Sequence, residues 1–273
     1  MDGDISGDVW LELMAEEAKK EVSGLELLRQ PATPALVRYL NDLHSVLGFK
    51  AYLWRTIVKA DYSHGDVTTF RADGDPPPPE SAVAQMDIHS AIFGEMLFCR
   101  DVNSFLTYLA DLTTLIYEKY PKKLPSNKQA TYQFCIEHHL AGDLISALAE
   151  ETVIELTHQS LDHLAKYFQK KLDLVLFTKD SDLENARLCV DIRNVITHNR
   201  GIVNRFLIQR NPRFADDLGK RIVLGEEESR EMLGTLGYCA RQLDLRAIKK
   251  FGLQTIKPEF KESTNEPSPD GAV

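Results

Sequence analysis

An arginine, an asparagine and a histidine stand close together in the stretch RNVITH. Arg193, Asn194 and His198 have the residue types that phosphate chemistry on RNA requires. An arginine offers a planar fork of donors to phosphate oxygens and stays charged. A histidine titrates near neutrality and can transfer protons, and RNA supplies its own nucleophile, the 2′-hydroxyl. These three residues are therefore candidate catalytic residues for RNA cleavage without a metal ion.

A helix through this stretch would gather the three side chains on one polar face. With Arg193 at zero on a wheel of about 100° per residue, Asn194 lies at about 100° and His198 at about 140°. Asn194 and His198 are then close enough for the amide to orient the imidazole. Gly201 falls on the same face and would let a ligand or another backbone approach closely. The alternative is an ordinary solvated helix face without chemistry.

The net charge and the local charge of the chain give opposite indications about nucleic-acid binding. The net charge of −9 counts against nucleic-acid binding, because phosphate neutralisation needs cations. Residues 187–213, however, hold six arginines and one acid, a local balance of six minus one, or +5. Charge segregated in this way can attract anions despite the net sign. We therefore expect RNA-binding side chains around the candidate catalytic residues, at Arg187, Thr197, Arg200, Asn204 and Arg205.

Apolar periodicity predicts an all-α fold, an antiparallel helical bundle with an N-terminal helical extension. The clearest seam has 3-4-3-4 spacing and predicts a helix over about 80–120, closed by Pro121. Further helices are expected from Ser126 to about 172, with one bend or break, from about 182 through the RNVITH stretch, and from Gly225 to Phe251. Four main helices joined by modest loops form a bundle. The seam residues are Val102, Phe105, Leu109, Leu112 and Ile116.

The sequence before this bundle divides into two parts. Residues 1–60 are expected to be a helical region, with an amphipathic helix near 5–23 and a helix that starts at Thr33 and Pro34 and can end at Gly48. Residues 51–59 are compatible with helix or strand. Residues 61–79 are rich in proline and glycine and predict a linker. The bundle then covers 80–252, and the polar residues 253–273 predict a disordered tail.

Several classes of protein and site are not expected. No apolar run approaches the roughly 18 residues of a membrane span, and the acidic start is unlike a signal peptide, so we expect a cytoplasmic protein without membrane contact. The four cysteines fall in apolar helical patterns, which predicts buried, reduced thiols. Glu155 and His158 have the Glu-x-x-His spacing of di-iron bundles, but no second copy occurs. We therefore expect no metal ion and no cofactor.

The stretch DIRNVITHNRGIVNRF resembles the signature of HEPN domains, in which an arginine is followed by four to six residues and a histidine. A polar residue, often asparagine, follows the arginine of that signature, so Arg193, Asn194 and His198 match its three positions. The resemblance covers about residues 82–250. It implies a dimeric four-helix bundle that cleaves RNA without metal and leaves a 2′,3′-cyclic phosphate and a 5′-hydroxyl. Arg193 would then bind the scissile phosphate, His198 would transfer protons, and Asn194 would orient His198 or contact RNA.

A single histidine per chain also favours a dimer. One imidazole cannot stand on both sides of an in-line phosphoryl displacement, whereas a twofold axis beside the helix would bring second copies of Arg193 and His198 into one cleft. The expected partners are therefore RNA and a second copy of the chain. Because HEPN proteins occur as toxins and as defence or stress effectors, the resemblance also implies an antitoxin or regulatory protein as a partner. The alternative is a non-catalytic HEPN-like module for dimerisation or for binding RNA or protein.

Overall fold

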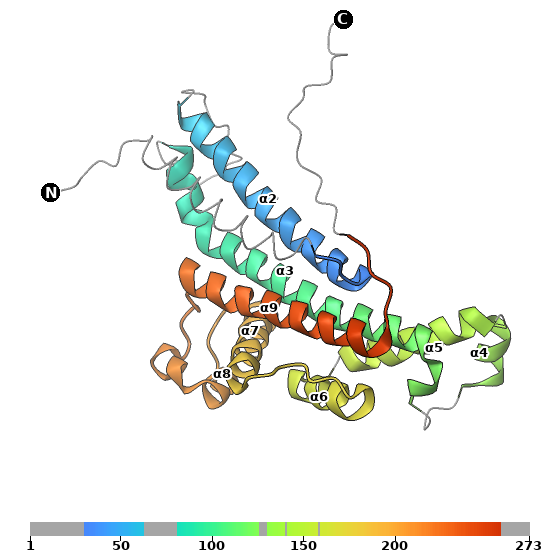
Figure 1. Ribbon diagram of the computed structural model, residues 1–273. Coiled ribbons are helices and arrows are strands. Elements are labelled where there is room, and N and C mark those ends of the chain that lie inside the picture. Colours follow the sequence, from blue (N-terminus) through green and yellow to red (C-terminus); the bar gives the residue numbers. More distant parts are fainter. Residues whose placement is uncertain (1–29, 63–80, 126–129, 140, 158, 258–273) are drawn as a thin grey trace, which may run out of the picture.

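The computed structural model describes residues 30–62, 81–125, 130–139, 141–157 and 159–257 (Figure 1). Within these ranges the chain forms helices and two isolated β-bridges but no strand, which confirms the all-α prediction. None of the described helices combines the length and apolar character that a membrane crossing requires. The expected helix near 5–23, residues 63–79 of the expected linker and residues 258–273 of the expected tail lie outside the described part.

The helix α3 (Ala82–Lys119) lies at the centre of the molecule. It contacts four other helices, α2 (Pro34–Tyr62), α5 (Ala141–Thr157), α7 (Asp180–Asn199) and α9 (Glu226–Phe251). Every residue of its predicted seam is buried, and none is more than 1% exposed. Ser81 begins the helix by accepting a hydrogen bond from the Ala84 amide at 3.0 Å, and Pro121 follows directly after its end. The predicted helix over 80–120 is therefore confirmed in type and in extent.

The helix α2 (Pro34–Tyr62) runs antiparallel to α3 without a break (Figure 1). The prediction that a helix ends at Gly48 is therefore wrong, and the strand alternative for 51–59 is excluded. A glycine inside a helix costs about 1 kcal/mol relative to alanine, which packing against a neighbouring helix readily offsets. The Phe49 ring, directly after this glycine, lies 6.1 Å from the Phe93 ring of α3. Tertiary contact thus overrides the local stop signal.

Both ends of the described chain are held against the bundle by hydrogen bonds and by packing. The Thr33 backbone amide and hydroxyl donate to the buried Asp244 carboxylate of α9 (Glu226–Phe251), at 3.1 and 2.5 Å. Ala32 pairs with Ile256 in an antiparallel β-bridge, and Leu253 is buried. The first residues of the expected disordered tail are therefore ordered, and α2 shares one hydrophobic core with the rest of the bundle.

The helix expected from Ser126 to about residue 172 is broken more often than the single break allowed for it. It consists of α4 (Tyr132–Glu137), α5 (Ala141–Thr157), α6 (Leu161–Tyr167) and the π-helical turn η3 (Phe168–Leu172). Local caps explain two of these boundaries. Thr131 accepts from the Phe134 amide at 3.2 Å, and Ser160 accepts from the His163 amide at 3.3 Å, so each hydroxyl starts a new helix.

The RNVITH stretch lies on α7 (Asp180–Asn199), which packs against α3 and α9. The chain leaves α7 through Arg200 and Gly201, both with positive φ, at 55° and 73°. It then forms α8 (Arg205–Arg210) and the turn η4 (Pro212–Asp217). An antiparallel β-bridge between Ile202 and Arg221 joins the segments before and after these two elements. The last helix, α9, ends at Phe251, as predicted, and Gly252 follows it as the C-cap.

Candidate functional site

Arg193 and Asn194 are joined by a direct hydrogen bond. The Arg193 Nη1 donates to the Asn194 Oδ1 at 2.7 Å, and both residues are partly buried on α7. The Arg193 Nε is buried and has no hydrogen-bond partner within the described part of the chain. No described carboxylate forms an ion pair with this guanidinium. Arg193 is thus a partly desolvated cation that no carboxylate of the described residues neutralises.

The Arg193 side chain lies close to α3, where Cys99 provides a partly buried thiol. Thr197 forms a hydrogen bond with the Cys99 thiol, and the charge of Arg193 acts on the same thiol. Burial raises the pKa of Cys99, and these two neighbours oppose that rise. Burial also lowers the pKa of Arg193. Arg193 and Thr197 therefore face α3 together, as their separation of one helical turn requires.

His198 lies in the last turn of α7 and is exposed. The Asn194 amide oxygen is bonded to Arg193, so the expected orientation of His198 by Asn194 is not what the structure shows. Asn194 holds the guanidinium instead, and the imidazole has no hydrogen bond or ion pair within the described residues. The structure thus places the arginine, asparagine and histidine on one helix but divides them between a partly buried pair and a solvent-facing histidine.

Gly201 is needed for packing. It is buried with φ of 73°, in the left-handed region that favours glycine, and it follows the end of α7. A Cβ atom at this position would lie 3.0 Å from the Glu95 Oε1 of α3. Glu95 in turn accepts two hydrogen bonds from Arg221, at 2.8 and 2.6 Å. The close approach expected at Gly201 is therefore made by a side chain of α3, which fixes the end of α7.

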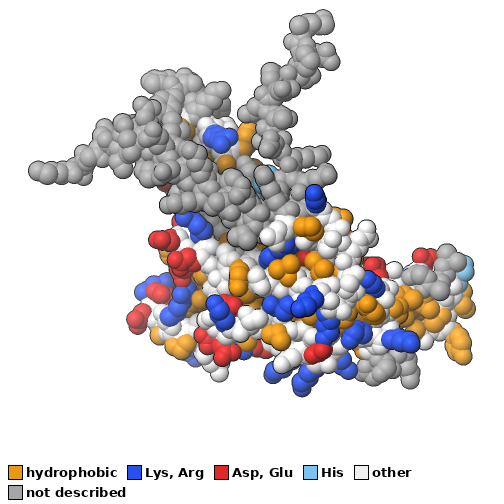
Figure 2. Space-filling view, viewed as in Figure 1, with side chains coloured by type: hydrophobic (Ala, Val, Ile, Leu, Met, Phe, Trp, Pro, Cys, Tyr) orange, Lys and Arg blue, Asp and Glu red, His pale blue; other side chains and the backbone are white. Residues whose placement is uncertain are grey.

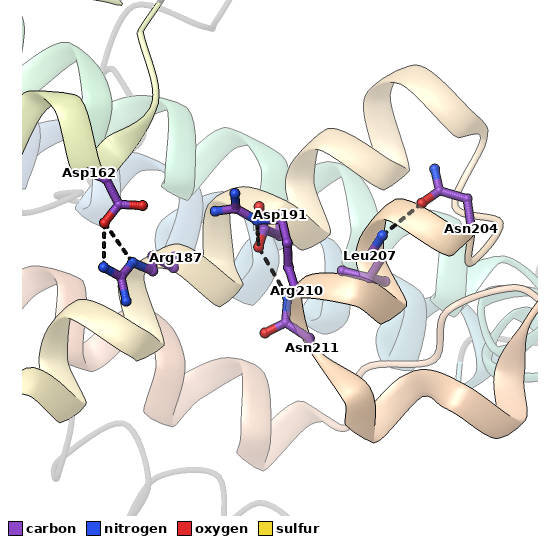
Figure 3. A network of polar contacts seen from close by, with 7 residues as sticks. All are labelled: Asp162, Arg187, Asp191, Asn204, Leu207, Arg210 and Asn211. Carbon is purple, nitrogen blue, oxygen red and sulfur yellow. Dashed lines mark hydrogen bonds and ion pairs between the residues drawn. The ribbon is translucent and has the colours of Figure 1, made fainter.

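Half of the arginines in the predicted basic cluster are paired with acids that lie close to them in space. The Arg187 Nε donates to Asp162 of α6 at 2.8 Å, and the Arg210 Nε donates to the buried Asp191 at 2.8 Å (Figure 3). Arg213 forms an ion pair with Glu228 at 2.6 Å. Two of these acids lie outside the sequence window 187–213, so the local charge of +5 overstates the field at the surface. In particular, Arg187 holds α6 against α7, which makes it a structural residue.

The remaining predicted RNA-binding residues divide in the same way. Asn204 starts α8 by accepting from the Leu207 amide at 2.9 Å, which occupies its side-chain oxygen (Figure 3). Arg200 and Arg205 are exposed, and neither forms an ion pair within the described ranges. On the face seen in Figure 2, acidic and basic side chains lie side by side over the lower left of the molecule, and basic side chains are more frequent over its lower centre.

Three residues around the site were not predicted from sequence. Cys99 and Glu95 come from α3, about a hundred positions before RNVITH, and Arg221 comes from the chain after η4. The apolar pattern around Cys99 predicted a buried thiol, but Cys99 and Cys135 are only partly buried, whereas Cys189 and Cys239 are buried; all four are free. The packing of α3 against α7 brings Glu95 and Cys99 to the site, and the bridge between Ile202 and Arg221 brings Arg221.

The sequence matches no protein-family model, and neither a curated protein nor a solved structure matches it. The residues of α7 and their surroundings are therefore the basis for assigning a function.

Proposed function

We propose that this chain is a metal-independent endoribonuclease of the HEPN type, which cleaves RNA by attack of the 2′-hydroxyl on the adjacent phosphate. One observation carries the proposal: Arg193 is a partly desolvated guanidinium without a carboxylate partner in the described chain, on the same helix as the exposed His198. A buried cation is costly unless an anion pairs with it. A phosphodiester would supply that anion and would place its 2′-hydroxyl within reach of an imidazole.

In the proposed reaction, Arg193 binds the scissile phosphate and stabilises the charge of the five-coordinate phosphorus. His198 removes the proton of the 2′-hydroxyl, and the freed oxygen attacks phosphorus. The bond from phosphorus to the 5′-oxygen breaks, and His198 of a second copy donates the proton that this oxygen takes up. The products are a 2′,3′-cyclic phosphate and a 5′-hydroxyl, so the step needs no water, metal ion or oxidant.

Asn194 has a positioning role in this proposal. Its side-chain oxygen holds the Arg193 Nη1 at 2.7 Å, so the donors that remain on the guanidinium are aimed by the amide. Preorganised donors of this kind act without reorganisation when charge develops. Asn194→Ala should therefore weaken phosphate binding, and Asn194→Asp, which keeps an acceptor but adds a negative charge, should weaken it further.

The second candidate function is a non-catalytic module that binds RNA or protein. The partial burial of Arg193 against Cys99 favours it, because packing alone explains part of the position of this side chain. In that case a phosphate could still be bound at Arg193, but His198 would have no chemical task. The two functions differ in whether RNA is cut and in whether His198 matters.

The test incubates the purified full-length chain with a mixed RNA pool in the presence of a chelator. Cleavage that leaves 5′-hydroxyl ends should fall by about 100- to 10,000-fold in His198→Ala, the range expected for loss of general acid–base catalysis. His139→Ala, which changes an exposed histidine after α4, is the matched control and should cleave normally. Bound but uncut RNA would establish the RNA-binding form of the second function. Neither binding nor cleavage would exclude the ribonuclease and the RNA-binding module, and only protein binding would be left.

A further inference from the structure

The N-terminal half of α3 carries a row of exposed apolar side chains. Ile88, Ile92 and Met96 follow one another at intervals of four residues and are 65%, 51% and 65% exposed. On a wheel of about 100° per residue they cover roughly 80° of the helix surface. Contiguous apolar surface of this kind usually marks an interaction site in a protein that folds in water. We call these three residues the α3 row.

The same face of α3 is covered in the C-terminal half of the helix. Leu106 and Ala110 follow Ile88 and Ile92 by five turns of about 3.6 residues, and therefore point in the same directions. Together with Leu156 of α5 and other side chains of α3, α5 and α6, they line a small apolar cavity. One half of this face thus packs under α5 and α6, whereas the other half ends in the exposed α3 row.

The helix α2 widens this surface. Phe49 and Tyr52 are 52% and 67% exposed, and the Phe49 ring contacts Phe93, which links α2 to α3 beside the α3 row. Five large apolar side chains exposed to this degree would bury on the order of 600 Å² per copy if a partner covered them. Two copies would then bury about 1,200 Å², the lower end of the range for specific interfaces.

We propose that the α3 row, with Phe49 and Tyr52, is the contact between two copies of this chain. A twofold axis makes such a contact self-complementary, because the same surface serves both copies. The equal spacing of the α3 row fits an antiparallel pair of α3 helices: Ile92 meets its own copy on the axis, and Ile88 meets Met96 of the second copy. The area reaches the lower end of the range for a specific dimer, and the contacts named here pair apolar with apolar side chains.

This contact would bring the second copy to the edge of the candidate site. Met96 precedes Cys99 by one turn of α3, and Cys99 is hydrogen-bonded to Thr197, next to His198. A copy lying on the α3 row would therefore stand beside the end of α7 and could supply the second histidine. This consequence for catalysis rests on the proposed function, whereas the dimer itself does not.

The test is sedimentation equilibrium of the full-length chain without RNA. The chain should be dimeric at micromolar concentration, and Ile92→Glu should raise the dissociation constant by about 100-fold or more, since a charge would lie at the centre of the contact. Ile136→Glu is the matched control, because Ile136 is 71% exposed on α4 and should leave the dimer intact. Oxidation of Ile92→Cys should link two copies through a disulfide that the unaltered chain does not form.

Two results would overturn the proposal. One is a monomeric unaltered chain, and the other is an Ile92→Glu variant that dimerises as tightly as Ile136→Glu. Loss of RNA cleavage alone would not bear on the contact, because Arg193→Ala should abolish cleavage and leave the dimer unchanged.

Discussion

The arginines of residues 187–213 form two groups that differ in what their charge does. In the first group, each guanidinium closes an ion pair with an acid; its members are Arg187, Arg210 and Arg213. In the second group, no carboxylate forms an ion pair with the guanidinium within the described chain; its members are Arg193, Arg200 and Arg205. The first group ties helices together, and only the second is available to an anion. Counting charge along the sequence cannot separate them.

The largest expected effect separates one arginine of each group. Arg193→Ala should reduce RNA cleavage by at least about 100-fold, because it removes the proposed phosphate ligand at a partly desolvated site. Arg187→Ala changes an arginine of similar burial on the same helix and should retain nearly full cleavage. Initial rates on one RNA substrate measure both, and circular dichroism verifies that both variants fold. Equal losses in the two variants would erase the distinction between the groups.

The next effect is on stability. Arg210→Ala should lower the free energy of unfolding by about 2 kcal/mol, because it leaves the buried Asp191 carboxylate with only the Asn211 amide as a partner. Urea denaturation measures this loss. Arg205→Ala is the control, since Arg205 is exposed without an ion pair in the described chain and should change stability by no more than about 0.5 kcal/mol. A loss as large in the control would contradict the assignment.

A smaller effect concerns RNA affinity. The double variant Arg200→Ala and Arg205→Ala should weaken RNA binding about tenfold and reduce its dependence on salt, because each phosphate contact with single-stranded RNA contributes about 0.7 to the salt slope. Fluorescence anisotropy at several salt concentrations measures both quantities. Arg213→Ala, which breaks the ion pair with Glu228, should leave the salt slope unchanged. An unchanged slope in the double variant would remove Arg200 and Arg205 from the RNA surface.

The smallest effect concerns Asp101, which, like Arg193, has a buried side-chain atom without a hydrogen-bond partner among the described residues. The Asp101 Oδ1 is buried without a hydrogen-bond partner in the described residues, and burial raises the pKa of this carboxyl from 3.8 to about 7. A raised carboxyl pKa means that the folded state holds the proton more tightly than the unfolded state, so stability falls as pH rises between these values and is lowest above about 7.

Asp101→Asn removes this ionisation. The variant should raise the Tm by a few degrees above neutral pH and should have little effect in acid, where the carboxyl is protonated in both states. Thermal melts over a pH series measure the difference. Asp87→Asn, at an exposed position of the same helix, should leave the pH dependence as it is. A Tm gain of equal size in acid and above neutral pH would show that ionisation is not the cause.

Much of the fold follows from local pattern. The seam of α3 has helical spacing and is buried over its whole length, and α9 ends at Phe251, as its pattern predicted. The errors arose where local signals compete with packing. Gly48 does not end α2, because Phe49 packs on α3, and the chain between α3 and α7 is divided by hydroxyl caps at Thr131 and Ser160 that its apolar pattern did not reveal.

The sequence predicted the helix that carries the candidate site but not the contacts of its side chains. Helical spacing placed Arg193, Asn194 and His198 on one helix, and the structure agrees. It could not show that Asn194 holds the arginine, because rotamers decide which neighbour an amide reaches. Nor could it show Glu95 or Cys99, whose distance along the chain hides their contact with the end of α7.

What the sequence determined by itself is periodic and local: the helical class, the seam of α3 and the gathering of an arginine and a histidine on one helix. What only the tertiary structure decided is which charges are free. The ion pairs of Arg187 and Arg210 join residues of different helices that the fold brings together. Coulomb attraction depends on the distance between two charges in space. Position along the chain does not fix that distance.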